Sequence, residues 1–160
     1  MLTLLFLLLQ VTLPIDHSVS KSGMTVEWTY LDKNHVKFNV SSPSSGWVAI
    51  GLNTEEQLVG SNLIMAAASP NGGIISDRFI VGFGNHQAVE DLGAKSQVEL
   101  LSAQNSNGGT TVEFILTTAA QDAYHFNLDK GETYYLTLAY SHDNDFMHHS
   151  AMRTSLEIIF

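Results

Sequence analysis

The sequence predicts an all-β protein, an antiparallel β-sandwich of about nine to eleven short strands. Two observations support this class. Apolar residues alternate with polar ones, or run together, over stretches of about six to nine residues, which is strand length. Clusters of Gly, Pro, Asn, Asp and Ser separate these stretches, as turns do. No heptads and no fixed repeat occur, and only residues 117–124 have the pattern of a helical turn.

The first half of the chain is expected to form four strands. The first two alternate in character and flank the turn sequence DKN, which predicts a hairpin. The third is the apolar run GWVAIGL, typical of a buried sandwich strand, and the fourth ends at the turn sequence PNGG. In order, these strands are expected at residues 25–30, 35–40, 46–52 and 61–69.

The second half continues the same pattern. The sequence NSNGG is a strong turn signal between two of its strands. The run TYYLTLAY and the final residues TSLEIIF are rich in β-branched and aromatic residues, which favour strands. The strands expected here cover residues 74–81, 97–102, 110–116, 133–140 and 154–160.

The composition excludes several classes of protein. A chain of 160 residues is long enough for one domain with a sizeable core. Seven Lys plus Arg against sixteen Asp plus Glu argue against nucleic-acid binding, which requires clustered cations. The absence of cysteine removes thiolate catalysis, Cys-ligated zinc, iron–sulfur clusters and disulfides. The acidic balance favours a basic partner or maintains solubility.

The first residues form an apolar segment, MLTLLFLLL, that is too short to span a bilayer. Its length fits the apolar core of a secretory signal, although no cation precedes it and no A-x-A site follows. We therefore expect a signal peptide or N-terminal apolar segment at residues 1–14 and a single domain at residues 15–160. The expected location is secreted or periplasmic, with no membrane span after processing. The alternative is a first strand or a buried N-terminal segment.

The most unusual stretch is HDNDFMHHSAMR, residues 142–153, which lies between two expected strands. Imidazole and thioether side chains ligate haem iron or copper. A copper site could use His142, Met147 and His149. His148 and His149 are adjacent, so in extended backbone only one of them would face a given pocket. The alternative is a solvated polar loop.

Other signals of chemistry are weak. His35, His86 and His125 are scattered along the chain, and each is expected to be at the surface or satisfied internally. No nucleophile has a paired base, and no cofactor fingerprint is present. Trp28 and Trp47 lie within apolar strands and are expected in the core or at an interface. We therefore expect a binding or electron-transfer module and not an enzyme.

Four segments, taken together, resemble the DOMON domain family. They are GWVAIGLN (46–53), VGSNLI (59–64), the strand with Asp77, and LAYSHDNDFMHHSAMR (138–153). The resemblance covers most of residues 24–160. It implies an immunoglobulin-like β-sandwich, usually extracytoplasmic. Members such as the cytochrome domain of cellobiose dehydrogenase, and domains fused to cytochrome b561, carry a b-type haem, and other members are suspected of binding sugars.

The resemblance also implies positions for haem ligands. The family histidine lies four residues before an arginine near the last strand, so Arg153 places it at His149, with His148 the runner-up. The family methionine precedes the segment that here reads GSN, and that position holds Leu58, which cannot ligate iron. A haem held by His149 alone would be five-coordinate. The candidates for a substitute sixth ligand are Met65, Met147 and Met152.

Two functions follow from the resemblance and the residues. The first is an exported domain that binds haem b through His149 for electron transfer or haem sensing, with a redox partner protein. The second is a non-enzymatic ligand-binding or interaction module, most readily for sugar, that has lost the haem methionine at Leu58. The second predicts aromatic rings on an accessible face, drawn from Trp28, Tyr30, Tyr134 and Tyr135.

Overall fold

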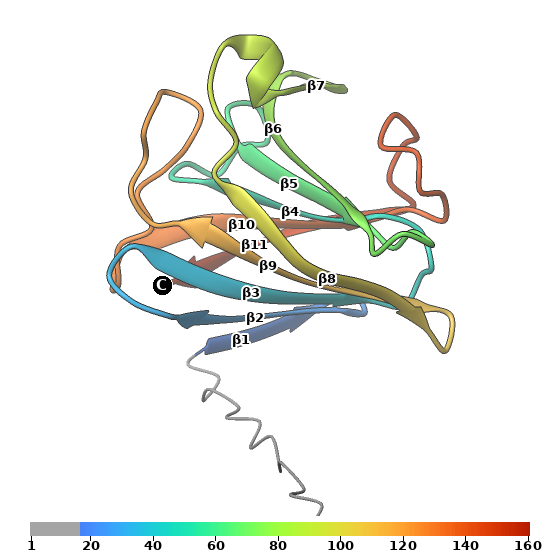
Figure 1. The fold of residues 1–160 in the computed structure, drawn as a ribbon. Coiled ribbons are helices and arrows are strands. Elements are labelled where there is room, and N and C mark those ends of the chain that lie inside the picture. Colours follow the sequence, from blue (N-terminus) through green and yellow to red (C-terminus); the bar gives the residue numbers. More distant parts are fainter. Residues whose placement is uncertain (1–16) are drawn as a thin grey trace, which may run out of the picture.

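The structure is a computed structural model and describes residues 17–160. The expected signal segment, residues 1–14, lies outside the described residues. The described chain forms eleven strands in two antiparallel sheets, which pack face to face as a sandwich (Figure 1). The all-β prediction and the expected number of strands are confirmed.

One sheet has five strands in the order β1-β2-β3-β9-β8. The expected hairpin is present, with Thr25 opposite Ser41 and Tyr30 opposite Val36. Alternate side chains of β3 point into the core and toward solvent, as expected of a sheet with one solvent-exposed face. The strands of this sheet are β1 (His17–Lys21), β2 (Met24–Tyr30), β3 (His35–Ser42), β8 (Val98–Ser106) and β9 (Gly109–Thr117).

The second sheet has six strands in the order β11-β10-β4-β5-β6-β7. Every residue of its central strands β4 and β5 is buried, so this sheet is covered on both faces. The five-stranded sheet covers the inner face, and loops of the chain must therefore cover the outer one. The strands are β4 (Val48–Asn53), β5 (Asn62–Ala67), β6 (Ile74–Gly82), β7 (Asn85–Ala88), β10 (Thr133–Tyr140) and β11 (Met152–Ile159).

Aromatic side chains fill much of the space between the sheets. Phe38 and Phe114 stack with ring centroids 5.4 Å apart, on directly paired strands. Phe160 packs edge-on against Phe38 and against Tyr134. Such pairs contribute about 0.5–1.5 kcal/mol each beyond the area they bury. These rings form the centre of the inter-sheet core.

The elements that the sequence did not predict are short and polar. Strands β1 and β7 have little apolar alternation, and both lie at sheet edges. Residues 117–124, the one segment with the pattern of a helical turn, hold no helix. The one helix in residues 17–160 is a single 3-10 turn, η1 (Val89–Leu92). No helix in this range is long and apolar enough to cross a membrane.

Candidate functional site

A second apolar cluster lies on the outer face of the six-stranded sheet, separate from the inter-sheet core. Directly paired residues of neighbouring strands form its centre, with Ala49 between Met65 and Ala139. Leu58, Val59 and Phe146 reach it from the two loops that cover this face. The buried members are Trp47, Ala49, Leu63, Met65, Ala67, Ile80 and Ala139.

A cavity of about 140 Å³ lies over this apolar cluster. The small side chains of Ala49 and Ala139 form part of its floor, and residues 147–150 of the loop between β10 and β11 border it from above. His149, His148 and Met65 all line this cavity, and so does Leu58. The structure therefore brings these four residues together on the outside of one sheet.

The two adjacent histidines line the same cavity because the loop that bears them is not a strand. The expectation of one histidine per pocket, which assumed extended backbone, does not apply here. One nitrogen of the His148 ring is engaged, since its Nδ1 lies 3.1 Å from a carboxylate oxygen of Asp143, whereas its Nε2 has no partner among the described residues. The His149 ring has no hydrogen bond or ion pair with a described residue. Of the two, His149 has both ring nitrogens available.

The acidic residues of the HDND sequence shape this loop. The Asp143 carboxylate accepts from the backbone N–H of Asp145, and the Asp145 carboxylate accepts from that of Met147. The hydrogen bond from Asp145 N–H, followed by that from His148, lowers the pKa of Asp143 from its ordinary value. Asn144 donates to the carbonyl of Ala68 and fastens the loop to the end of β5. Local hydrogen bonds of this kind suit Asp and Asn to turns.

The Gly-Trp pair before β4 anchors the base of the loop. The backbone N–H of Trp47 donates to the carbonyl of Asp143 at 2.9 Å, and the backbone carbonyl of Trp47 accepts from Ser141 N–H at 3.0 Å. A Cβ at Gly46 would lie 2.6 Å from the backbone nitrogen of Asp143 and would also clash with the Ser141 carbonyl oxygen. The first residue of the GWVAIG motif must therefore lack a side chain for the histidine loop to close down.

Two residues considered from the sequence do not reach the cavity. Met152 packs against the inter-sheet core, so its thioether lies on the other face of the sheet. His142 lies 2.9 Å through its Nδ1 from the hydroxyl of Ser44 and does not line the cavity. Met147 does line it, although its side chain is 74% exposed. The structure therefore does not bring His142 together with Met147 and His149 in this cavity.

His86 is a cavity residue that sequence reasoning missed. It lies on β7, opposite Ile80 of β6, and lines the cavity beside His149. Arg78 donates from its Nε to Nδ1 of His86 at 2.7 Å and from its Nη2 to the His86 carbonyl at 3.2 Å. Burial, and then the charge of Arg78, lower the pKa of His86 from its ordinary value. Nothing in the local sequence of His86 indicates this pairing with a residue on another strand.

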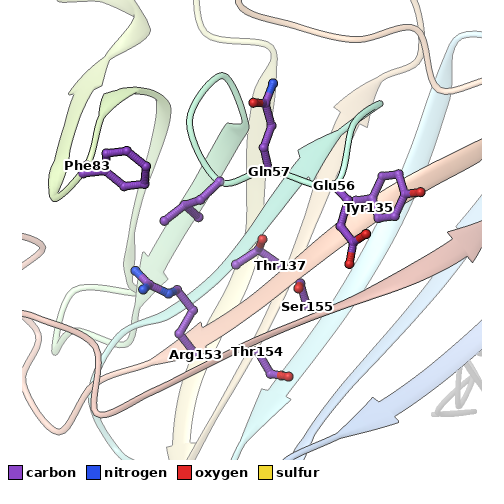
Figure 2. Close-up of a pocket in the computed structure, with 9 residues that line it drawn as sticks. Glu56, Gln57, Phe83, Tyr135, Thr137, Arg153, Thr154 and Ser155 are labelled. Carbon is purple, nitrogen blue, oxygen red and sulfur yellow. The ribbon is translucent and has the colours of Figure 1, made fainter.

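An open groove of about 430 Å³ adjoins the cavity and shares Leu58, Thr137 and Arg153 with it. Figure 2 shows Phe83 and Arg153 on one side of the groove and Tyr135 and Glu56 on the other. The Phe83 side chain is 91% exposed. The outer face of the sheet thus carries a small apolar cavity that continues into a larger, more polar groove.

A buried charged cluster lies on the inner side of the same sheet. Asp77 of β6 accepts hydrogen bonds from the Asn62 amide at 2.7 Å and from Gln97 N–H at 2.8 Å. Its carboxylate also lies 2.9 Å from Nε2 of His125, whose Nδ1 lies 2.7 Å from Asp122. Each carboxylate therefore holds one nitrogen of the His125 ring. The expectation that His125 is satisfied internally is confirmed.

A family model of the DOMON domain matches residues 20–141 of the chain. The chain belongs to the DOMON family. It is also similar to the cytochrome domain of Myriococcum thermophilum cellobiose dehydrogenase. That match has 12% identity and a TM-score of 0.62, and covers 89% of this chain and 80% of the other. The cytochrome b domain of pyranose dehydrogenase from Coprinopsis cinerea matches with 9% identity and a TM-score of 0.63, covering 85% and 76%. These likenesses concern the fold.

The DOMON sandwich places its aromatic residues mainly inside. Trp28 and Tyr134 are only 2% and 3% exposed, so the expectation that they line an accessible face is wrong. Both point between the sheets because their strands alternate that way. Tyr30 is half-buried and donates to the carbonyl of Leu128. Tyr135 alone of the four lines the outer-face groove.

Proposed function

We propose that this DOMON domain binds a b-type haem in the outer-face cavity, with His149 as an axial ligand, for electron transfer or haem sensing. The observation that carries the proposal is the shared cavity of His149 and Met65, two side chains able to ligate iron. His149 belongs to the loop above the cavity, and Met65 belongs to its floor. The ring of His149 has no competing partner among the described residues.

The residues of the cavity fit a porphyrin in kind. The floor is apolar, as the apolar faces of a porphyrin require, and the donor set combines imidazole and thioether. Trp47 adds a buried indole N–H without a hydrogen-bond partner in the described chain. The volume of 140 Å³ is below the roughly 300–1,000 Å³ of ligand pockets, so binding requires residues 144–150 to open toward the adjoining groove.

The residues that line the cavity have different roles in this proposal. His149 offers a nitrogen lone pair, and Met65 offers a thioether in place of the methionine that Leu58 replaces. The alanines of the floor give close contact with a flat ring, and the apolar walls exclude water. When bound, the haem supplies a one-electron couple. A redox partner protein is part of the electron-transfer form of this proposal.

We expect His149→Ala to abolish axial haem ligation. The purified chain is mixed with haemin, and the Soret band is followed in absorbance. The wild type should give a ligand-shifted Soret band, and His149→Ala should lose that shift because the variant lacks the imidazole proposed as the ligand. His142→Ala is the matched control, since His142 lies outside the cavity, and it should behave as the wild type. Loss of the shift in His148→Ala alone would contradict the assignment to His149.

The proposal includes a location outside the cytoplasm, for which the support is the apolar run of residues 1–9. Determining the first residue of the protein recovered from cells tests this part. A mature chain that retains residues 1–14 would contradict it.

A second candidate function, sugar binding, is favoured by the open groove. Tyr135 and Phe83 flank it, and the hydroxyls of Thr137, Thr154 and Ser155 line it. Aromatic rings beside hydroxyl groups suit a ligand with apolar and polar faces. If this function is right, Tyr135→Ala should weaken binding of a glycan identified on an array by about two- to tenfold, the size of one aromatic contact. An array on which the protein binds no glycan would contradict the sugar-binding function.

A further inference from the structure

The outer-face cavity has a one-sided charge. The chain carries sixteen Asp plus Glu against seven Lys plus Arg, yet no acidic side chain lines the cavity among the described residues. Its charged or ionisable members are Arg153 and three histidines. Arg153 forms no hydrogen bond or ion pair with a described residue. A cavity with these groups and without carboxylates favours a ligand that presents a negatively charged or hydrogen-bond-accepting group.

The hydrogen bond between Arg78 and His86 fixes the proton on the His86 ring. An arginine side chain only donates, so the Nδ1 atom that receives its Nε–H at 2.7 Å carries no proton. The ring is therefore neutral, with its proton on Nε2. Two further contacts hold Arg78 in place, from Nη2 to the His86 carbonyl and from Nη1 to the Ser76 hydroxyl.

The same bond limits what His86 can do in the cavity. Ligation of a metal through Nε2 needs a lone pair, and Nε2 bears the proton while Arg78 donates to Nδ1. His86 is therefore not a replacement for the missing methionine at Leu58. Its Nε2–H has no partner among the described residues, and Nδ1 is taken, so Nε2 is the polar ring atom left for a ligand.

We infer that His86 is a fixed hydrogen-bond donor of the cavity and donates from Nε2 to a carboxylate oxygen of an amphipathic ligand. Arg78 fixes the tautomer of the ring by donating to Nδ1. The inference rests on the proposed function in that the same cavity holds the ligand. The apolar floor takes the body of the ligand, and His86 and Arg153 take its acid group. Arg78 is a positioning residue, because it acts through His86.

The first test needs no ligand. In the full chain labelled with ¹⁵N, long-range ¹⁵N–¹H spectra distinguish protonated from unprotonated ring nitrogens. His86 should carry its proton on Nε2 and none on Nδ1. Arg78→Met, which keeps the length of the side chain without a donor, should release the ring to exchange between tautomers. A proton on Nδ1 of wild-type His86 overturns the inference.

The second test uses matched ligands with and without a carboxylate. Haemin and its dimethyl ester form one pair, and octanoate and octanol form the other. His86→Phe should weaken haemin binding by about tenfold or more, the size of a hydrogen bond to a charged group, and leave the ester unaffected. His86→Gln, which keeps an N–H donor, should recover part of the loss.

The octanoate pair separates this inference from the proposed function. If the wild type binds no haemin, the haem proposal fails, while octanoate still reports on His86. Octanoate should shift the Nε2 and Nε2–H signals of His86, and octanol should not. Equal shifts with both compounds, or none with either carboxylate, overturn the inference whether or not haem binds.

Discussion

Replacing Asp77 with alanine should lower the free energy of unfolding by about 3–5 kcal/mol, the cost of removing one partner from a buried ion pair. The carboxylate lies between His125, the Asn62 amide and Gln97 N–H, and all three lose an acceptor in the variant. The Asp77 side chain has no exposed surface, so water cannot take its place. Urea unfolding followed by tryptophan fluorescence measures the change.

The exposed pair of Asp32 and His35 supplies the control for Asp77. It has the same residue types and a similar separation of 3.0 Å, but about half of each side chain is in solvent. Asp32→Ala should therefore leave the unfolding midpoint nearly unchanged, since exposed pairs contribute little. A similar loss in both variants would show that the buried position of Asp77 is not the cause.

The cluster around His125 should also make stability depend on pH. Burial lowers the pKa of His125, but the hydrogen bonds and charges of Asp77 and Asp122 outweigh it, so the pKa lies above its ordinary value of 6.5. The folded state therefore binds this proton more tightly than the unfolded state. This contribution is full below about pH 6.5 and is lost as the pH rises through the folded-state pKa. In Asp77→Ala, the decrease in the free energy of unfolding toward alkaline pH should be smaller, because Asp77 no longer raises the pKa of His125.

The pKa of Asp122 is shifted in the opposite direction, so its effect on stability falls at acid pH. Burial raises its pKa, but hydrogen bonds from the Tyr124 N–H and from His125 outweigh this, so the pKa lies below its ordinary value of 3.8. Its contribution is present above that value and is lost as the pH falls through the folded-state pKa. Unfolding midpoints across the pH range should therefore pass through a plateau between the two transitions.

Removing the thioether of Met65 should abolish the proposed sixth ligation of the haem, and adding a thioether at position 58 should restore it. Met65→Leu removes the proposed sixth ligand and should leave the iron five-coordinate through His149. Adding Leu58→Met returns a thioether at the methionine position that the family resemblance implies, and Leu58 lines the same cavity. We therefore expect the double variant to regain six-coordination.

Two measurements follow this change in ligation. Carbon monoxide should bind the reduced Met65→Leu protein quickly and the double variant slowly, because the sixth position is then occupied. The midpoint potential should fall in Met65→Leu by on the order of 0.1 V and recover in the double variant, within the roughly 0.8 V that axial ligands span. Leu58→Ile, which adds no sulfur, is the volume-matched control. Unchanged carbon monoxide kinetics in Met65→Leu would exclude Met65 as a ligand.

Sequence patterns predicted the sandwich well because the apolar residues of most strands are the residues that the fold buries. The run GWVAIGL indicated a buried sandwich strand, and every residue of β4 is buried. The pattern could not show what covers the second face, because the cover consists of loops held by hydrogen bonds such as that from Trp47 to Asp143. Strands β1 and β7 escaped prediction since edge strands with polar residues lack the apolar alternation that indicates a strand.

The candidate site could be predicted where its residues are adjacent in the chain. His148 and His149 were found from one segment, although their shared orientation depends on the turn that Asp143 and Asp145 impose. His86 was missed because its chemistry depends on Arg78, eight residues away on another strand. Pairings of this kind follow from sheet register, which local sequence does not reveal.

The position of the cavity outside the sheet also bears on the order of assembly. The inter-sheet core closes through Phe38, Phe114 and Phe160 with no contribution from the cavity. Because the outer-face cluster is separate from that core, we expect a ligand of the proposed site to bind and leave without global unfolding. In the proposed function, ligand entry displaces the loop that bears His149, while the packing between the sheets stays as it is.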